Sequence, residues 1–298
     1  MSRGEPADSG RLAATPPRRY ATTAAFEAAL KARLLARVTP RRTMQDLRKL
    51  LAFDRVLARL SHVAPDAWLL KGGVALEYSL QQARATTDID ISVRVDLETM
   101  TETLQAAAAV QLHDYFTIRL GERTKPAEGV DSYRFHVTVL YENGRVFEEV
   151  KIDVGFADPW LGKARTLTAE PLLDFAGIEP VTVRAIPAEQ HLAEKVHAYT
   201  RRYGHGESSR VKDLVDMALL VQEPLDPDFL VRSLEDVFRE RETHELPVAL
   251  PRPPARWDAV YARLAKSLPI PPTSSEAHLR VADALARALA RARAGATA

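Results

Sequence analysis

Two aspartates at alternate positions are the first residues whose spacing suggests chemistry. They are Asp88 and Asp90, in the segment TTDIDISV over residues 86–93. Successive side chains of a strand point to opposite faces, so both carboxylates share one face, about 6–7 Å apart, and the apolar side chains share the other. In a cleft such a pair repels by about 3 kcal/mol at an effective dielectric near 20. The pair therefore favours a bound cation, with a hydrated strand edge as the alternative.

A pair of glycines, Gly72-Gly73, precedes this strand and separates a short apolar run from a helical pattern. Backbone amides in such a turn can approach a phosphate closely, and a helix N-terminus favours negative charge. No P-loop or GxGxxG pattern accompanies the glycines, so an ordinary turn is the alternative.

A third carboxylate follows the same alternation in EEVKIDVGFAD, residues 148–158. Asp153 and Lys151 fall on one face of this predicted strand, and apolar residues fall on the other. If the two strands are neighbours, Asp153 joins Asp88 and Asp90 as an oxygen-only ligand set for Mg²⁺, completed by substrate phosphates and water. Two such ions would activate an attacking hydroxyl and stabilise a leaving pyrophosphate. A solvated strand face is the alternative for Asp153 alone.

Together these features resemble a known superfamily. Gly-Gly, a spacer, Asp-x-Asp on a strand and a later strand carboxylate are similar to the motifs of the nucleotidyltransferase fold. KGGVALEYSL followed by ARATTDIDISV resembles more specifically the AbiEii nucleotidyltransferase-like toxins, which include the MenT toxins. The resemblance continues in IPAEQHLAEKVHAYTRRYG and SSRVKDLVDMALL, and it spans about residues 45–222.

The resemblance implies a fold and a role for each motif. Asp88 and Asp90 would bind a catalytic Mg²⁺ or Mn²⁺, and the glycine pair would lie near the triphosphate of an NTP. Lys195 and Asp213, in the two later motifs, would be essential for activity. The implied fold is α+β, a nucleotidyltransferase-type mixed sheet flanked by helices and followed by a helical C-terminal domain.

One position departs from the pattern of the superfamily. Many nucleotidyltransferases carry Gly-Ser where this chain has Gly72-Gly73, which leaves only backbone donors at that point. In related toxins a hydroxyl residue just before the first aspartate is a phosphorylation target of the antitoxin. Thr86 or Thr87 would occupy that place.

The residues of the later motifs also have ordinary explanations. Lys195 borders an apolar helical stripe, so its ammonium reaches either a cleft or bulk water. Asp213 lies in the first turns of a helix, where the helix dipole stabilises any carboxylate. Asp216, one turn later, would either share a cleft-facing side with Asp213 or, as we expect, lie on a solvated face. We expect His191 to be an ordinary helix histidine. Arg210 is a candidate for nucleotide binding beside a glycine-bearing loop, with solvated charge as the alternative.

Hydrophobic periodicity predicts the elements that must position these residues. Asn143-Gly144 predicts a hairpin with a type I′ turn, in which both positions have positive φ. The pattern divides the chain into a mobile basic tail (1–22), a nucleotidyltransferase-like α/β domain (23–186) and a helical domain (187–298). Helices are predicted over residues 26–38, 44–62, 74–80, 97–110, 187–203, 209–222, 227–241, 257–267 and 276–293. Strands are predicted over 68–70, 86–93, 115–120, 133–141, 146–156 and 182–186.

Composition narrows the class of protein. The chain has 298 residues, 41 Lys and Arg against 40 Asp and Glu, and no cysteine, which excludes disulfides, thiolate metal sites and cysteine nucleophiles. No apolar run is long enough to cross a bilayer, and the N-terminus shows no secretory signal, so we expect a cytoplasmic protein with no membrane partner. Residues 1–60 carry 13 basic residues against 5 acidic ones. This excess fits either nucleic-acid contact or solvated helix surface.

The resemblance therefore predicts the toxin of a toxin–antitoxin system. It would be a metal-dependent nucleotidyltransferase that adds NMP from an NTP to the 3′ acceptor end of tRNA, which blocks aminoacylation and translation. Its partners would be tRNA, NTP and a cognate antitoxin protein. Two alternatives stay open: an enzyme of the same fold that modifies a protein or a small molecule, and a non-catalytic module that binds nucleotide or a partner.

Overall fold

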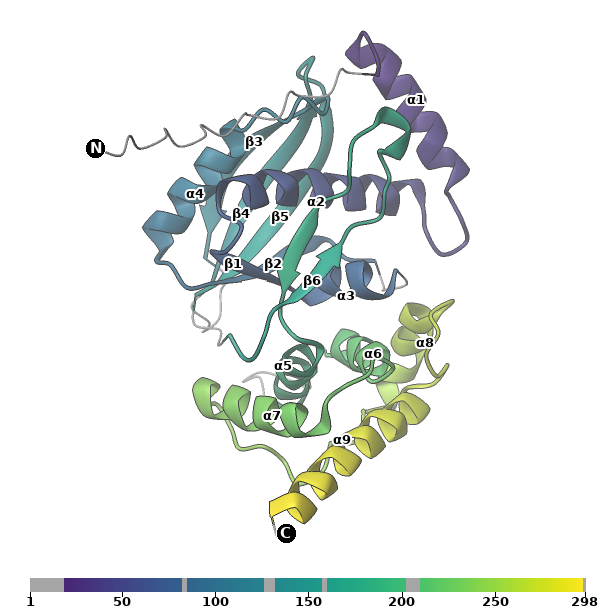
Figure 1. Ribbon diagram of the computed structural model, residues 1–298. Coiled ribbons are helices and arrows are strands. Elements are labelled where there is room, and N and C mark those ends of the chain that lie inside the picture. The colour runs from purple at the N-terminus through teal and green to yellow at the C-terminus, as the bar shows by residue number, and fades with distance from the viewer. Residues whose placement is uncertain (1–18, 82–84, 126–131, 157–159, 202–209, 297–298) are drawn as a thin grey trace, which may run out of the picture.

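A sheet flanked by helices forms one half of the molecule, and a group of helices forms the other (Figure 1). The computed structural model describes residues 19–81, 85–125, 132–156, 160–201 and 210–296. Most of the tail predicted over residues 1–22 lies outside these ranges. The predicted α+β class is confirmed, because a mixed sheet is followed along the chain by helices alone. The domain boundaries stay a prediction.

The described residues form a seven-stranded sheet in the order β3-β4-β5-β2-β1-β7-β6. β2 runs parallel to β5 and β1 runs parallel to β7, whereas the other neighbours are antiparallel. The two strands that carry the predicted metal ligands, β2 and β5, are therefore direct neighbours. Sequence patterning missed one strand, the short β6. The strands are β1 (Trp68–Lys71), β2 (Asp88–Val93), β3 (Phe116–Thr124), β4 (Ser132–Tyr141), β5 (Val146–Gly155), β6 (Arg165–Thr168) and β7 (Thr182–Ala185).

The predicted hairpin between β4 and β5 is present, but its turn differs from the expected one. Gly144 has a φ of +84°, whereas Asn143 is not among the described residues with positive φ, so the type I′ prediction is wrong. The amide of Gly144 donates to the carbonyl of Tyr141, and the amide of Tyr141 donates to the carbonyl of Arg145, both at 2.8 Å. A three-residue loop with glycine in the left-handed conformation thus closes the hairpin.

Helices cover the apolar face of the sheet. The alternation in β2 buries Ile89 and Ile91 completely, and both belong to a core shared with α1, α2 and α4. A capping box between Thr43 and Asp46 fixes the start of α2, which crosses the sheet in Figure 1. The helices of this half are α1 (Thr23–Ala36), α2 (Met44–Val63), α3 (Gly72–Leu80), α4 (Leu97–Ala109) and the 3₁₀ turn η1 (Asp174–Ala176).

The helices after the sheet have a hydrophobic core of their own. This second core includes Leu76 of α3, so the short helix after the glycine pair joins the two halves of the molecule. The helices are α5 (Ala188–Thr200), α6 (Val211–Leu220), α7 (Pro227–Arg241), the 3₁₀ turn η2 (Ala255–Trp257), α8 (Asp258–Ala265) and α9 (Ser274–Ala296). Among the described helices, none has the length and hydropathy that a membrane span requires.

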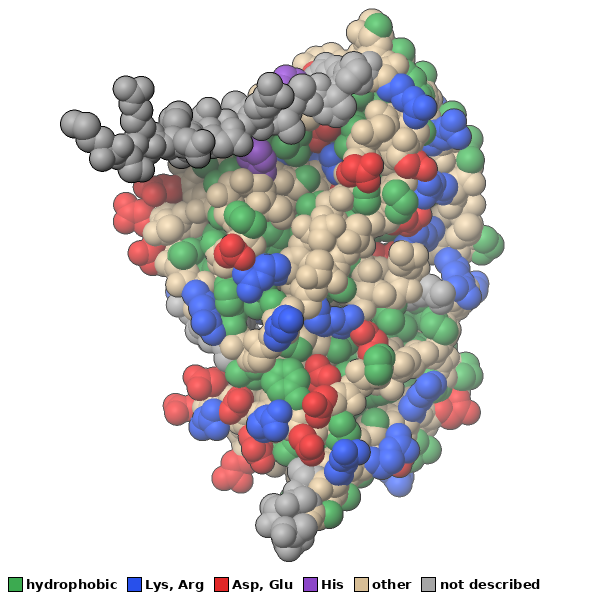
Figure 2. Space-filling model, in the orientation of Figure 1, with side chains coloured by type: hydrophobic (Ala, Val, Ile, Leu, Met, Phe, Trp, Pro, Cys, Tyr) green, Lys and Arg blue, Asp and Glu red, His purple; other side chains and the backbone are tan. Residues whose placement is uncertain are grey.

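Internal ion pairs account for part of the basic excess at the front of the chain. Arg55 and Arg59 of α2 are only 3% and 1% exposed. Arg59 donates to both oxygens of Asp114, at 2.9 and 2.7 Å, and Arg55 contacts Asp54. On the face shown in Figure 2, basic and acidic side chains are interspersed. Because these two arginines are buried, they provide neither nucleic-acid contact nor solvated helix surface.

Candidate active site

Four charged residues lie side by side across four neighbouring strands. The register pairs Lys71 of β1 with Asp90 of β2, Asp90 with Asp153 of β5, and Asp153 with Arg134 of β4. We call these four residues the charged row. Two carboxylates thus lie between two cations, on the face of the sheet opposite the core packed by α2 and α4.

Arg134 forms a two-pronged ion pair with Asp153. Its Nε donates to Oδ1 at 2.7 Å, and its Nη2 donates to Oδ2 at 2.6 Å. The same Nη2 lies 3.5 Å from Oδ2 of Asp88. The hydrogen bonds to Asp153 raise the pKa of Arg134, so its charge is permanent. Asp153 therefore lies beside the other two aspartates, as expected, but both of its oxygens face a guanidinium.

Asp90 differs, because no hydrogen bond or ion pair reaches its carboxylate from the described residues. Burial raises the pKa of Asp90 to about 7, against the opposing effect of Lys71 and Lys195. The charges of Asp88 and Asp153 add to this rise. Within the described ranges no three acidic or histidine side chains form a ready metal cluster. Asp88 and Asp90 nevertheless fit Mg²⁺, which takes one or two protein carboxylates and completes its shell with phosphate and water.

The turn before α3 requires glycine at its first position. Gly72 has a φ of +66°, and a Cβ there would lie 1.9 Å from Oδ2 of Asp90. Lys71, the N-cap residue of α3, makes no capping hydrogen bond with its side chain. The turn thus brings the N-terminus of α3 directly against Asp90. The backbone amides there favour an anion, such as a phosphate that also contacts a cation bound by the carboxylates.

Gly73 is packed against a threonine. A Cβ at Gly73 would lie 2.7 Å from Oγ1 and 2.8 Å from Cβ of Thr86. A serine here, as in the related motif, would require Thr86 to move. Thr86 is half-buried and donates to the carbonyl of Asp88 at 3.3 Å, whereas the exposed Thr87 donates to Oδ1 of Asp88 at 2.7 Å. Both hydroxyls that were considered for phosphorylation therefore lie next to the first aspartate.

The two later motifs meet through Lys195. Its Nζ on α5 lies 3.1 Å from Oδ1 of Asp213 and 2.8 Å from Oδ2 of Asp216, both on α6. Asp216 is fully buried, so the expectation of a solvated face is wrong. Arg210, the N-cap residue of α6, lies 3.7 Å from Asp213. The Lys195 ammonium is held by two carboxylates and does not extend into bulk water.

A cleft of about 170 Å³ joins the two sets of residues. Since Gly72 and Asp90 border it from the sheet and Lys195 and Asp213 border it from the helices, half of the predicted site residues face one space. Asp88, Asp153, Gly73 and the two threonines do not line the cleft itself. The lining residues are Lys71, Gly72, Asp90, His191, Glu194, Lys195, Ala198, Arg210, Asp213 and Arg241.

Several residues of this cleft were not predicted from the sequence. Lys71 directly precedes the glycine pair, and its position was a usable signal. Glu194 lies 3.9 Å from Lys71 and 3.6 Å from Arg241, which comes from the last turn of α7. His191 is buried in the wall of the cleft, and burial lowers its pKa to about 3, so the ring is neutral. Only the three-dimensional fold brings Glu194, Arg241 and His191 to the site.

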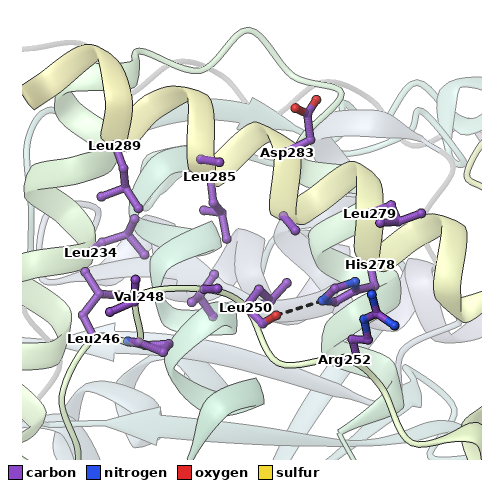
Figure 3. Close-up of a pocket in the computed structure, with 15 residues that line it drawn as sticks. Leu234, Leu246, Val248, Leu250, Arg252, His278, Leu279, Asp283, Leu285 and Leu289 are labelled. Carbon is purple, nitrogen blue, oxygen red and sulfur yellow. Dashed lines mark hydrogen bonds between the residues drawn. The ribbon is translucent and has the colours of Figure 1, made fainter. Parts of the chain in front are cut away.

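A second cavity, of about 490 Å³, lies within the helical half (Figure 3). It is lined mainly by apolar side chains of α9 and of the segment 246–252, and His278 donates from Nε2 to the carbonyl of Leu250 at 2.9 Å. None of the predicted site residues borders this cavity. Arg252 and Asp283 also line it, but most of its lining is apolar, unlike that of the cleft.

The fold and this cleft define a class of protein. A mixed sheet with an Asp-x-Asp strand, a glycine turn at a helix N-terminus and a facing Lys–Asp pair are the parts of a nucleotidyltransferase. The sequence also matches the family described as "Nucleotidyl transferase AbiEii toxin, Type IV TA system" over residues 55–291. The match covers most of the chain, which therefore belongs to this family of toxin–antitoxin nucleotidyltransferases.

A solved structure, that of MenT4, supports this fold. MenT4, a nucleotidyltransferase toxin from Mycobacterium tuberculosis H37Rv, is 16% identical with a TM-score of 0.59, over 88% of this chain and 89% of that chain. JHP933 from Helicobacter pylori is 14% identical with a TM-score of 0.48, over 83% of this chain and 95% of that chain. No curated protein matches the chain by sequence.

Proposed function

We propose that this nucleotidyltransferase transfers a nucleoside monophosphate from an NTP to the 3′ acceptor end of tRNA, in the cytoplasm, and so acts as a toxin. The addition would block aminoacylation and stop translation, until a cognate antitoxin protein counteracts the toxin. The observation that carries the proposal is the cleft, in which Gly72, Asp90, Lys195 and Asp213 meet from distant parts of the sequence. Its mixture of cations and carboxylates suits a triphosphate with its metal better than an apolar ligand.

Each wall of the cleft has a role in this proposal. Asp88 and Asp90 would hold Mg²⁺ or Mn²⁺, which would supply charge neutralisation for the phosphates and activation of the attacking hydroxyl. The amides after Gly72 and the cations Lys195 and Arg210 bind the triphosphate. Asp213 fixes the Lys195 ammonium at 3.1 Å. Catalysis then rests on positioning and charge neutralisation, as in other phosphoryl transfers.

The reaction itself exchanges a phosphoanhydride bond of the NTP for a phosphodiester bond of the acceptor. The 3′-hydroxyl oxygen of the acceptor forms a bond to the α-phosphorus, while the bond from that phosphorus to the α–β bridging oxygen breaks. Pyrophosphate leaves with the electron pair of the broken bond, and the hydroxyl proton passes to water.

Labelled nucleotides test the proposal directly. Incubating the protein with each of the four α-labelled NTPs, Mg²⁺ and total tRNA should place label on the 3′ end of tRNA. Asp90→Asn should lose transfer. Asp66→Asn is its matched control and should keep it, because Asp66 is 83% exposed and pairs with Arg184 at the surface. Label that enters only protein or a small molecule would favour the other acceptor classes. A complete lack of transfer, with intact nucleotide binding, would favour a non-catalytic module.

Thr86 and Thr87 are the candidate sites at which the antitoxin would phosphorylate and inhibit the toxin. A phosphate on either hydroxyl would add negative charge beside Asp88, to which Thr87 is bonded at 2.7 Å. Incubation with the cognate antitoxin and ATP, followed by mass spectrometry, should locate a phosphate on one of them. Transfer activity should survive antitoxin treatment in the matching Thr→Ala variant, and modification elsewhere would contradict this part of the proposal.

A further inference from the structure

The ion pair between Arg134 and Asp153 changes what Asp153 can do. Both oxygens of Asp153 accept hydrogen bonds from one guanidinium, at 2.7 and 2.6 Å. A fork of this geometry is among the strongest side-chain interactions, and it places a fixed positive charge against both oxygens, which disfavours a metal ion at the same carboxylate. Asp90, directly across the register from Asp153, has no such partner among the described residues. The two neighbouring carboxylates are therefore in different states.

Arg134 keeps hydrogen-bonding capacity beyond this fork. A guanidinium has five N–H donors, and the fork uses one on Nε and one on Nη2. The second Nη2 donor faces Asp88 at the long distance of 3.5 Å, and no partner of Nη1 is found within the described ranges. The Arg134 side chain is 34% exposed, so these donors are accessible to a ligand. They suit a phosphate oxygen, which accepts planar, two-pronged contacts.

The order of the strands indicates whether Arg134 would bind a phosphate of the NTP or one of the acceptor. The charged row runs Lys71, Asp90, Asp153 and Arg134 across β1, β2, β5 and β4. The glycine turn follows β1, at the Lys71 end of the row. If the triphosphate lies at that turn, Arg134 is on the opposite side of the carboxylates. The attacking group must approach the α-phosphorus opposite to the leaving pyrophosphate, and that is the side of Arg134.

We propose that Asp153 is a positioning residue and not a metal ligand, and that it holds Arg134 to bind a backbone phosphate of the acceptor nucleic acid. The inference rests on the proposed function, since it assumes a nucleic-acid acceptor. It separates the carboxylates into a metal pair, Asp88 and Asp90, and an anchor, Asp153. Arg134 thereby becomes a contact for the acceptor that the motifs of the sequence did not include.

Mn²⁺ binding tests the role of Asp153 without turnover. Free Mn²⁺ is measured by electron paramagnetic resonance during titration of the full chain. Asp153→Asn should bind Mn²⁺ within about threefold of wild type, whereas Asp88→Asn should lose about tenfold or more. An equal loss in the two variants would overturn the inference, because it would make Asp153 a ligand.

RNA binding tests the role of Arg134. The probe is a fluorescein-labelled RNA hairpin with a single-stranded 3′ end, and its Kd is measured by polarisation at several salt concentrations. Arg134→Ala should raise the Kd about tenfold and lower the log–log salt slope by about 0.7, as loss of one phosphate contact does. Arg134→Lys should recover the slope but only part of the affinity, since lysine keeps the charge without the fork. Arg119→Ala, on an exposed arginine of β3, should change neither quantity.

The relation between the two variants gives the decisive comparison. Asp153→Asn should weaken RNA binding as Arg134→Ala does, and the double variant should be no weaker than Arg134→Ala alone, because both changes remove one interaction. Additive losses, or an unchanged salt slope, would overturn the inference. An inactive wild-type protein would instead contradict the proposed function, while the two binding experiments would still decide the roles of Asp153 and Arg134.

Discussion

The carboxylates on the two sides of the cleft differ in their partners. The sheet wall is the side formed by β2 and its neighbouring strands, and the helical wall is the side formed by α5 and α6. On the helical wall, one ammonium lies between Asp213 and Asp216, and Asp216 is fully buried. On the sheet wall, Asp90 has no hydrogen bond or ion pair to the described residues, and burial raises its pKa to about 7. The helical wall satisfies its charges internally. The sheet wall leaves a carboxylate whose charged form needs a cation from outside the chain.

This difference separates carboxylates that are paired within the chain from a carboxylate that is not. A buried ion pair that is complete contributes to the folded state, and breaking it is costly because the remaining charge is stranded. A buried carboxylate without a partner lowers stability at neutral pH and is therefore a candidate for ligand binding. The walls thus predict opposite outcomes for chemically identical Asp→Asn changes.

The largest effect is expected on the sheet wall. Asp88→Asn or Asp90→Asn should reduce nucleotide transfer on the order of 1,000-fold, because a group that stabilises the charge of the transition state is removed. The Tm of Asp90→Asn should stay within about 2 °C of wild type or rise, since Asp90 has no ion pair or hydrogen bond to the described residues. Steady-state transfer assays and calorimetry measure the two quantities. A variant that keeps wild-type transfer would exclude the metal mechanism.

The helical wall should respond in stability. Asp216→Asn leaves Lys195 with a single carboxylate and places an uncharged amide at a site with no exposure, so the free energy of unfolding should fall by about 3 kcal/mol. Asp283→Asn in α9 is the matched control, because Asp283 and its partner Arg287 are 61% and 71% exposed. That change should cost less than about 0.5 kcal/mol. Urea unfolding compares them, and equal costs would contradict the distinction between the walls.

Local patterning revealed the sheet wall more completely than the helical wall. Asp88, Asp90 and Asp153 were predictable because period-two alternation states which face a side chain occupies. The pairing of Arg134 with Asp153 was not, since it depends on hairpin register, and the turn at Asn143-Gly144 differed from the predicted type. In a helix, one turn places neighbours such as Asp213 and Asp216 on the same side, but sequence alone does not say which side is buried.

The site residues that patterning did not identify are brought to the cleft by contacts between elements far apart in the sequence. Arg241 enters the cleft from the end of α7, and nothing near it in the sequence resembles a site motif. Lys71 was visible next to the glycine pair, yet only the pairing of β1 with β2 places it beside Asp90. The family resemblance supplied Lys195 and Asp213 as candidates. The structure adds that these residues face the same space as Gly72 and Asp90.

A comparison of two glycine variants distinguishes the cost of close packing from the cost of backbone strain. Gly72 and Gly144 both have positive φ, but a Cβ would meet Asp90 at 1.9 Å in the first case and nothing within 4 Å in the second. Gly144→Ala should therefore cost about 1 kcal/mol from strain alone, and Gly72→Ala about 2–3 kcal/mol with loss of transfer. Chemical denaturation and the transfer assay measure both. Equal costs with preserved transfer would show that the turn does not need to approach the carboxylate.

The pH dependence of stability tests whether Asp90 lacks a partner in the folded chain. The pKa of Asp90 is about 7 in the folded chain, above the ordinary value of 3.8, so the metal-free folded state retains a proton that the unfolded state has lost between these values. The resulting stabilisation is complete below about pH 4 and is lost as the pH rises to about 7. Calorimetry without metal should therefore show the Tm of wild type falling, relative to Asp90→Asn, across this range and not above it.

Metal binding should have the opposite pH dependence, because Mn²⁺ competes with that proton. Below pH 7 the affinity of the wild-type chain for Mn²⁺ should fall by up to about tenfold per pH unit, and above pH 8 it should be constant. Asp153→Asn should keep this profile, since the proton and the metal share Asp90 and not Asp153. An affinity that is flat from pH 5 to pH 8 would mean that the metal does not bind at Asp90, and the contrast between the two walls would then need another explanation.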